Sequence, residues 1–395
     1  MTRVIELTEY VKKTIPRDGL SQEVAQSIWQ NHKKQISVET PSFQNDQQWQ
    51  LTSEGYVGYL PINPELTLAL RPKVPLGNLF GMLEYAYQID FKLFEGLVEC
   101  DTLQEFYERL ANVLAKRVID RQRRGLHRKY VTVVERGAYI RGRLNLADRI
   151  RRPWNVESEC RYEEHTPKIA DNQIIGWTLR TIMQARTCSE RVRPTMRRAH
   201  RGMSGLNLVR YNGDSCTHWT YNRLNADYKV LHALCHFFLD KSGPDHQVGD
   251  RSMLPFLIDM NKLFQEFVAA WLRTHLPPTY SLQAQSRVVL SQDDHLNFII
   301  DLVLKNVRTG LTVCVLDTKY KRPDKPSSAD IAQAAAYAEA KHCCEAILVY
   351  PSFKTGHTKS EVGRIRVRSI PFSLDADLES AGQTFLAKIL EITSF

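Results

Sequence analysis

The stretch of sequence that decides the fold runs from Phe298 to Tyr320 and reads FIIDLVLKNVRTGLTVCVLDTKY. Two apolar runs, residues 298–304 and 311–316, stand on either side of a short polar turn that contains glycine. This pattern is typical of a β-hairpin. The first run is interrupted by Asp301, and the second ends directly before Asp317. A carboxylate inside a buried strand costs free energy unless it is paired or bound to a metal ion, so the hairpin is a candidate functional site.

The register of the hairpin decides whether the two aspartates meet. A three-residue loop, Arg308–Gly310, places glycine at the left-handed position that such loops favour, and it pairs Asp301 with Asp317. A two-residue loop would pair Asp301 with Leu316 and turn Asp317 to the opposite face. We favour the first register because of the glycine. Directly opposed residues have Cβ atoms about 4.5–5.5 Å apart, close enough to share one ion.

Two neighbouring carboxylates and a lysine suit the hydrolysis of a phosphodiester bond. Asp301 and Asp317 offer only oxygen ligands, which a hard ion such as Mg²⁺ prefers, with Mn²⁺ as the alternative. Lys319 follows Asp317 by two residues and therefore points to the same side of the strand. Its ammonium could orient the attacking water or stabilise charge that develops on a phosphate.

A helix is expected next, over residues 328–341, with Ser327, Ser328 or Asp330 as its capping residue. Gln333 and Tyr337 lie four residues apart and therefore share one face of this helix. They are either part of the site or ordinary surface and core residues. A helix over 257–272, strands over 283–290 and 346–350, and the hairpin together predict a mixed sheet with flanking helices.

The rest of the chain divides into two parts before this domain. Short strands with glycine and proline between them indicate a β-rich N-terminal domain, residues 1–155, which also contains helices over 77–87 and 103–125. Residues 156–252 predict a helical middle region, with helices over 170–187 and 222–240. Residues 253–395 form the predicted catalytic domain. The fold class is therefore mixed α/β.

Basic residues crowd the middle of a chain whose 395 residues carry a net charge of +9. Such a protein attracts polyanions. These cations either contact the phosphates of a nucleic acid or an acidic partner, or they form solvated helix faces. They fall into three groups: Lys116, Arg117, Arg121, Arg123, Arg124, Arg128 and Lys129; Arg141, Arg143, Arg149, Arg151 and Arg152; and Arg193, Arg197, Arg198 and Arg201.

The cysteines and the absence of long apolar stretches indicate a cytoplasmic protein. The eight cysteines are scattered and form no CxxC pair, which is typical of reduced thiols. The sequence contains no signal-peptide pattern at its start and no run of eighteen apolar residues, so we expect no membrane partner. His232, Cys235 and His236 lie at helical spacing, but without a visible fourth ligand they are interpreted as core residues rather than a zinc site.

Several of these segments resemble a known family. The run from Ile300-Asp-Leu through Leu316-Asp-Thr-Lys-Tyr-Lys to Gln333-Ala-Ala-Ala-Tyr-Ala resembles the PD-(D/E)XK nuclease superfamily. The whole chain resembles the McrC family, the nuclease subunits of McrBC-type modification-dependent restriction systems. Further resembling segments are Arg71-Pro-Lys-Val, Met82-Leu-Glu-Tyr-Ala, Tyr139-Ile-Arg-Gly-Arg-Leu and Met260-Asn-Lys-Leu-Phe-Gln-Glu-Phe-Val.

The resemblance implies roles for the residues named above. Asp301 and Asp317 would bind the metal, and Lys319 would assist the attacking water, while Gln333 and Tyr337 would belong to the auxiliary helix. The family often has a glutamate where this chain has Gln265. Its neighbour Glu266 points about 100° away on a helix and cannot simply replace that group. A third carboxylate ligand is therefore unassigned.

The resemblance also implies partners. McrC-like subunits bind a hexameric AAA+ GTPase of the McrB type through their N-terminal part, stimulate it, and act with it on double-stranded, methylated DNA. This chain contains no GxxxxGK[ST] phosphate loop, in agreement with a motor supplied by another subunit. Two alternatives remain: a non-cleaving subunit that binds DNA and activates the GTPase, and a nuclease that acts alone.

Overall fold

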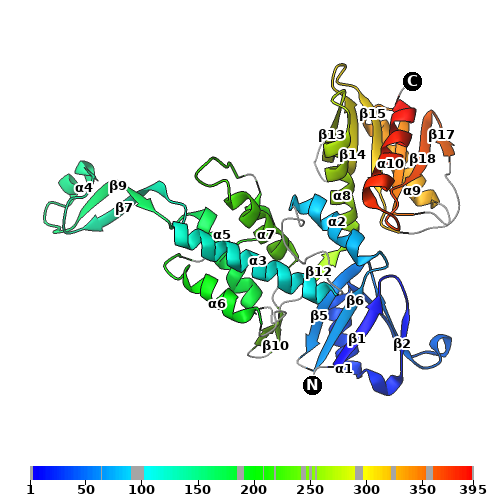
Figure 1. Ribbon diagram of the computed structural model, residues 1–395, viewed down its shortest axis with the longest axis horizontal. Coiled ribbons are helices and arrows are strands. Elements are labelled where there is room, and N and C mark those ends of the chain that lie inside the picture. Colours follow the sequence, from blue (N-terminus) through cyan, green and yellow to red (C-terminus); the bar gives the residue numbers. More distant parts are fainter. Residues whose placement is uncertain are drawn as a thin grey trace. The chain divides into compact units, whose positions relative to one another are not determined.

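The computed structural model shows a mixed α/β protein (Figure 1). It describes residues 3–63, 65–89, 102–184, 191–207, 209–217, 219–241, 246–248, 251–253, 256–289, 297–321, 326–352 and 359–393. The chain forms two compact units: unit 1 contains Met1–Gln104 and Pro255–Phe395, and unit 2 contains Glu105–Leu254. The predicted boundary between 252 and 253 lies close to the end of unit 2, whereas the predicted boundary between 155 and 156 falls inside it.

The N-terminal part of unit 1 contains two small sheets. One has the strand order β1-β6-β5-β12 and the other β2-β4-β3. Their elements are β1 (Arg3–Thr8), β2 (Lys13–Ile15), α1 (Gln22–His32), β3 (Ile36–Glu39), β4 (Trp49–Ser53), β5 (Tyr56–Asn63), β6 (Leu66–Arg71) and, after the sheets, α2 (Leu76–Tyr87). Buried aliphatic side chains from both sheets and α1 form one core. The predicted β-rich start of the chain is thereby confirmed.

A strand from the distant part of the chain completes the first sheet. β12 (Phe256–Asp259) pairs antiparallel with β5. The predicted helix start at Leu257 is therefore wrong: α8 (Met260–His275) begins three residues later, where Asp259 accepts hydrogen bonds from two backbone amides of the first turn. Residues 256–259 obtain their backbone hydrogen bonds from β5, which a local pattern cannot reveal.

The C-terminal part of unit 1 is a six-stranded mixed sheet in the order β13-β14-β15-β16-β18-β17. Helices α8 and α10 pack against each other through Trp271 and Gly382, and α9 packs on the strands that follow the hairpin. The strands and remaining helices are β13 (Tyr280–Val289), β14 (Asn297–Asn306), β15 (Thr312–Thr318), α9 (Ser328–Ala340), β16 (Glu345–Tyr350), β17 (Lys359–Val362), β18 (Ile365–Pro371) and α10 (Leu378–Thr393). The strand β16, which was expected to close this domain, is followed by two more strands and a helix.

The hairpin pairs its strands around the two aspartates as expected, but its turn differs from the predicted one. Leu302 pairs with Leu316, and continuing this register sets Asp301 opposite Asp317. Near the turn, however, Lys305 pairs with Thr312, one residue out of that register. The loop is thus four residues long rather than three, and a β-bulge after Leu304 restores the register further along the strands. Gly310 adopts the expected left-handed conformation (φ +71°).

Unit 2 combines a helical core with a β-arm. Its helices pack around buried aromatic and aliphatic side chains, and Gly125 ends α3 at φ +91° as predicted. We call residues 129–166 the arm: a three-stranded sheet in the order β7-β9-β8 with one short helix (Figure 1). The elements are α3 (Leu103–Arg124), β7 (Lys129–Gly137), β8 (Arg143–Leu144), α4 (Leu146–Arg151), β9 (Ser158–Thr166), α5 (Ala170–Gln184), α6 (Arg193–Arg201), α7 (Tyr228–Lys241), β10 (His246–Val248) and β11 (Arg251–Met253).

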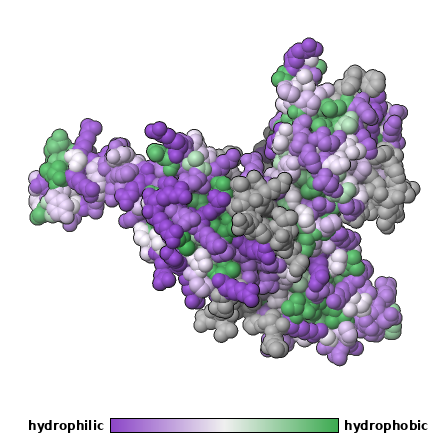
Figure 2. Space-filling model, in the orientation of Figure 1, coloured by the Kyte–Doolittle hydropathy of each residue, from purple (hydrophilic) through white to green (hydrophobic). Residues whose placement is uncertain are grey.

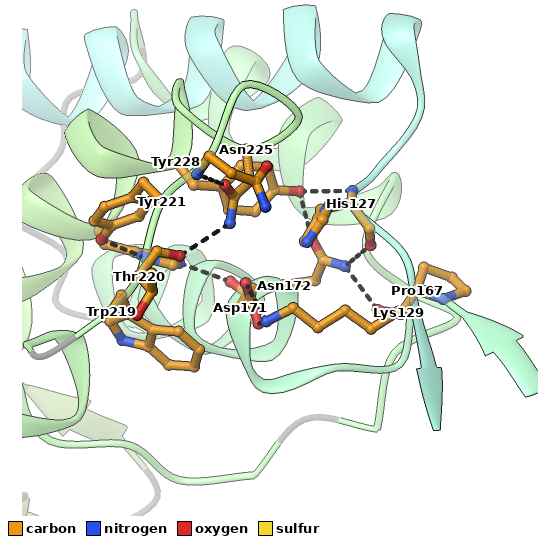
Figure 3. A network of polar contacts seen from close by, with 12 residues as sticks. His127, Lys129, Pro167, Asp171, Asn172, Trp219, Thr220, Tyr221, Asn225 and Tyr228 are labelled. Atoms are coloured by element: carbon orange, nitrogen blue, oxygen red, sulfur yellow. Dashed lines mark hydrogen bonds and ion pairs between the residues drawn. The ribbon is translucent and has the colours of Figure 1, made fainter. Parts of the chain in front are cut away.

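A buried polar network fastens the arm to the helices of unit 2 (Figure 3). Asn172 on α5 is fully buried and donates hydrogen bonds to the carbonyl oxygens of His127 (2.8 Å) and Pro167 (2.7 Å). It accepts one from the hydroxyl of Tyr228 (2.5 Å), which in turn accepts from the backbone amide of His127 (2.9 Å). Both ends of the arm are thereby held by one side chain.

Asn172→Ala is expected to lower the free energy of unfolding by about 2–4 kcal/mol, because three buried groups lose their partner at once. Chemical denaturation followed by circular dichroism measures the change. The exposed Asn31, whose side chain bonds to Ser27 on its own helix, provides the control: Asn31→Ala should cost less than about 0.5 kcal/mol. Equal effects of the two substitutions would contradict the role given to Asn172.

Candidate active site

Asp301 lies on β14 and is held by three hydrogen-bond donors. Gln265 on α8 donates from Nε2 to Oδ1 (2.6 Å). Thr318 donates to Oδ2 from its backbone amide (2.8 Å) and from its hydroxyl (2.7 Å). These bonds come from a helix and from the neighbouring strand, so they fix the orientation of the carboxylate from two sides.

Asp317 lies on β15 and is almost completely buried, with 2% of its surface exposed. Its Oδ2 forms an ion pair with Lys319 Nζ (2.9 Å), but among the described residues this oxygen has no hydrogen-bond partner of good geometry. Burial raises the pKa of Asp317 to about 6; Lys319 opposes this shift and Asp301 adds to it. A buried carboxylate with an unsatisfied oxygen is where a cation would relieve the greatest electrostatic cost.

Lys319 connects Asp317 to the following helix. Its Nζ donates to Gln333 Oε1 (2.9 Å), and Gln333 Nε2 donates to the hydroxyl of Tyr337 (2.8 Å). Burial lowers the pKa of Lys319, but the charges of Asp317 and Asp301 outweigh burial and raise it overall. The amine therefore stays protonated at neutral pH and can stabilise negative charge, but it cannot act as a base.

The five predicted site residues thus lie in one connected cluster. Two of them, Gln333 and Tyr337, lie on helix α9. This helix begins where Ser327 Oγ accepts a hydrogen bond from the backbone amide of Asp330 (3.2 Å). Gln333 is exposed and Tyr337 is buried. Burial and then the charge of Asp317 raise the pKa of Tyr337, so its hydroxyl remains protonated. The roles of these residues in catalysis remain predictions.

Gln265 and Glu266 point in different directions, as the helix geometry predicts. Gln265 faces Asp301, whereas Glu266 pairs with Lys262 one turn earlier on α8 (3.6 Å). Across the described ranges, no group of three or more His, Cys, Asp or Glu side chains is arranged to hold a metal ion. The cluster therefore offers two carboxylates and the amide of Gln265.

Sequence reasoning missed two contributors. Thr318 lies between Asp317 and Lys319, and its role becomes visible only once its amide and hydroxyl meet Asp301. Glu9, from the N-terminal part of unit 1, is buried and accepts from the hydroxyl of Tyr320 (2.8 Å), the residue after the lysine. Nothing local in the sequence indicates this second contact, which joins positions 311 residues apart.

The donor set fits a divalent hard cation. Asp301 and Asp317 supply carboxylate oxygens, the ligands that Mg²⁺ prefers. The unsatisfied Oδ2 of Asp317 lies beside the charge of Lys319, which by itself does not offset the burial of the carboxylate, since the pKa of Asp317 is still raised. These residues are therefore suited to hold Mg²⁺ or Mn²⁺.

Binding of Mg²⁺ is expected to weaken below about pH 6, because the ligand form of Asp317 is the ionised one and its pKa is about 6. The apparent affinity should fall about tenfold per pH unit below that value and level off above it. Without metal, the pKa of Asp317 is higher in the folded protein (about 6) than in the unfolded chain (3.8), so the folded state binds the proton more tightly. The free energy of unfolding should therefore decline as pH rises from 3.8 to about 6. The stabilisation by Mg²⁺ in thermal melts at about pH 5 and about pH 8 measures the first effect, and equal stabilisation at both values would contradict it. Melts without Mg²⁺ at about pH 4 and about pH 6 measure the second effect, and equal melting temperatures would contradict it.

The histidine and cysteine group of the middle region lies in the core of unit 2, as interpreted from the sequence. His232 is buried, and its ring nitrogens contact the hydroxyl of Tyr221 (3.0 Å) and the carbonyl oxygen of Asp171 (3.1 Å). Cys235 is fully buried, and burial raises the pKa of its thiol to about 12.

Within the described residues, no helix combines the length and the apolar character needed to cross a bilayer.

Comparison with known proteins agrees with this arrangement. A protein from Escherichia coli strain K12, "Type IV methyl-directed restriction enzyme EcoKMcrBC", is 22% identical over 258 residues, covering 63% of this chain and 74% of that protein. An assembly of Thermococcus gammatolerans McrB AAA+ hexamers with bound McrC contains a chain with the same fold: its TM-score is 0.58 at 18% identity, over 98% of this chain and 100% of that one. The family model described as McrBC 5-methylcytosine restriction system component matches residues 51–351. Since this match spans more than half of the 395 residues, the chain belongs to the McrBC 5-methylcytosine restriction system component family.

Proposed function

We propose that this chain is the McrC-type endonuclease subunit of a GTP-dependent, modification-dependent restriction complex, and that it hydrolyses phosphodiester bonds of DNA with Mg²⁺. The observation that carries this proposal is the convergence of the two neighbouring carboxylates: Gln265 bonds to Asp301, while Lys319 pairs with Asp317 and bonds to Gln333. A surface strand end rarely gathers two carboxylates, a protonated lysine and an unsatisfied buried oxygen by chance.

Each residue has a defined task in the proposed reaction. Asp301 and Asp317 would hold Mg²⁺, which when bound would supply Lewis-acid chemistry for the attack of water on the phosphoryl group. Lys319 keeps its proton on Nζ and orients that water or stabilises the charge on the phosphoryl oxygens. Gln333 holds Lys319 from α9, and Thr318 and Gln265 hold Asp301. The water oxygen forms a new bond to phosphorus as the P–O bond to the leaving oxygen breaks; the water loses a proton to the solvent, and the leaving oxygen takes a proton from the solvent.

A partner protein is part of the proposal. The solved assembly of similar fold contains McrC bound to McrB AAA+ hexamers, and we propose the same kind of partner here. The outer end of the arm carries large apolar side chains that are 65–82% exposed: Tyr139, Ile140, Leu146, Ile150, Trp154 and Val156. A cluster of this kind is typical of a protein–protein interface, so this surface is the best candidate for motor docking.

The experiment that tests the proposal is a cleavage assay on methylated and unmethylated duplex DNA, with and without an McrB-type partner and GTP. Cleavage only of methylated DNA and only with both additions is the expected result. Cleavage without partner or GTP would instead support a nuclease that acts alone. No cleavage under any condition, together with stimulation of the GTPase, would support the alternative of a non-cleaving subunit with a degenerate nuclease fold.

Gln265→Glu is expected to strengthen Mg²⁺ binding by about tenfold, because it adds a third carboxylate beside Asp301. A Mg²⁺ titration of the cleavage rate measures the shift. The neighbouring Glu266→Gln serves as control, since that side chain pairs with Lys262 one turn earlier on α8. Cleavage that appears only in the Gln265→Glu variant would show that the natural chain has lost the activity.

A further inference from the structure

A groove between α3 and α6 in unit 2 is lined by basic side chains and has no role in the site described above. Gln122 on α3 donates from Nε2 to the carbonyl oxygen of Ala199 on α6 (2.7 Å), which fixes the two helices side by side. The groove has a volume of about 410 Å³ and is lined by Lys116, Ile119, Asp120, Arg123, Pro194, Thr195 and Arg198. We infer that this groove binds the sugar–phosphate backbone of duplex DNA, as a second contact separate from the cleavage site.

The charge of the groove is strongly unbalanced. Lys116, Arg123 and Arg198 face one acidic residue, Asp120, whose carboxylate pairs with Arg123 (3.1 Å). In the part of the chain that the structure describes, Lys116 and Arg198 have no ion-pair or side-chain hydrogen-bond partner. The same two helices carry further exposed cations: Arg124 on α3, and Arg197 and Arg201 on α6. Hydrophilic surface covers the α3 region in Figure 2.

Other arginines of the same helix show what a structural role looks like. Arg121 is largely buried, pairs with Asp227 (3.3 Å), approaches the carbonyl oxygen of Leu224 and lies over the ring of Tyr228. The groove cations differ from Arg121: Arg123 forms only an exposed ion pair with Asp120 on its own helix, and Lys116 and Arg198 have no ion-pair partner among the described residues. Favourable interaction with the helix dipole is limited to the last turn, so it does not account for Lys116, which lies eight residues before the end of α3.

The composition of the groove favours a nucleic acid over an acidic protein. Stable protein interfaces have an apolar, aromatic core, whereas the groove contains only Ile119 and Pro194 as apolar residues. Protein–DNA interfaces are polar and strongly positive. Lys116 and Arg123 are seven residues apart, about 10 Å along the helix axis, so they can contact different phosphates. Arg198 adds a contact from the opposite wall.

The test is the salt dependence of DNA binding by the full chain, measured by fluorescence anisotropy with a duplex of about 30 bp and without Mg²⁺, so that no cleavage occurs. We compare the wild type with the triple variant Lys116→Gln, Arg123→Gln and Arg198→Gln. Each lost phosphate contact lowers the slope of log K against log [salt] by about 0.9. The variant should therefore lose about 2–3 from the slope and bind about 10–100-fold more weakly at about 0.1 M salt.

Two further variants make the result specific. Arg17→Gln, Lys33→Gln and Lys34→Gln remove the same charge from exposed positions of the N-terminal part and should change the affinity less than about twofold. Lys116→Arg, Arg123→Lys and Arg198→Lys keep the charge and should keep the slope. Equal slopes for the groove variant and the control would overturn the inference. Unchanged DNA binding with lost stimulation of a partner GTPase would assign the groove to an acidic protein surface instead.

This test does not depend on cleavage. If Asp317 variants and the wild type bind DNA alike while the groove variant does not, the groove is confirmed whatever the outcome for the proposed nuclease activity. If the groove variant binds DNA normally but no longer cleaves it, the groove is not a DNA-binding site, and the proposed nuclease activity is left untouched by this result.

Discussion

Asp317→Ala is expected to lower the rate of Mg²⁺-dependent DNA cleavage by about 10³-fold or more, while stimulation of the partner GTPase stays unchanged. In the proposed reaction Asp317 is a metal ligand, and among the described residues its Oδ2 has no hydrogen-bond partner of good geometry, so we expect no other group to replace it. A loss of about 4 kcal/mol of transition-state stabilisation corresponds to this factor. Single-turnover cleavage and GTP hydrolysis, measured on the same complex, give both numbers.

Asp317→Asn and Glu266→Gln sharpen this prediction. The first keeps the size of the side chain and should be as inactive as the alanine variant, but more stable than the wild type without metal, because it removes a buried charge. The second removes a carboxylate that lies on α8 outside the cluster and should leave cleavage within about twofold. Full cleavage by either Asp317 variant would refute the assignment of this residue as a metal ligand.

Lys319→Met is expected to reduce cleavage by about 10²–10³-fold, the loss typical when one stabilising donor is removed from a transition state. A second effect is expected at the metal. Lys319 lowers the pKa of Asp317, so its removal should raise that pKa further and shift the onset of Mg²⁺ binding to higher pH. Cleavage rates and Mg²⁺ titrations at several pH values separate the two effects.

Lys321→Met is the matched control, since Lys321 pairs with Asp330 (2.6 Å) rather than with Asp317. It should change neither the cleavage rate by more than about threefold nor the pH at which Mg²⁺ binds. Lys319→Arg should restore part of the activity, because it keeps the positive charge. If the Lys319→Met variant binds and cleaves like the Lys321→Met variant, the lysine of the site has no catalytic role.

The sequence by itself determined the elements that carry the candidate site. Alternating and continuous apolar runs identify strands β14 and β15, and the capping candidates Ser327, Ser328 and Asp330 indicate where α9 begins, because these signals depend on neighbouring residues alone; the structure selects Ser327. The spacing of Asp317 and Lys319 follows from the two-residue period of a strand. The helical middle region and the end of α3 at Gly125 were predictable for the same reason.

Only the tertiary structure decided how these elements are joined. The bulge beside Leu304 compensates a longer loop, so the aspartates are placed opposite each other by two local deviations that cancel. The strand β12 belongs to the N-terminal sheet because β5 offers it a free edge, and this contact makes unit 1 discontinuous in sequence. Hydrogen bonds between distant strands depend on the whole fold and leave no local pattern.

The sequence also could not predict which groups surround the site residues. The bond from Gln265 to Asp301 requires α8 to meet β14, the bonds from Thr318 require β15 to meet β14, and the burial of Asp317 depends on the packing around β15. Burial raises the pKa of Asp317, and only packing determines burial. The sequence therefore named the residues that carry the proposed chemistry, while the tertiary structure determined their charges, their partners and their orientation, because desolvation and hydrogen bonding are properties of the packed molecule.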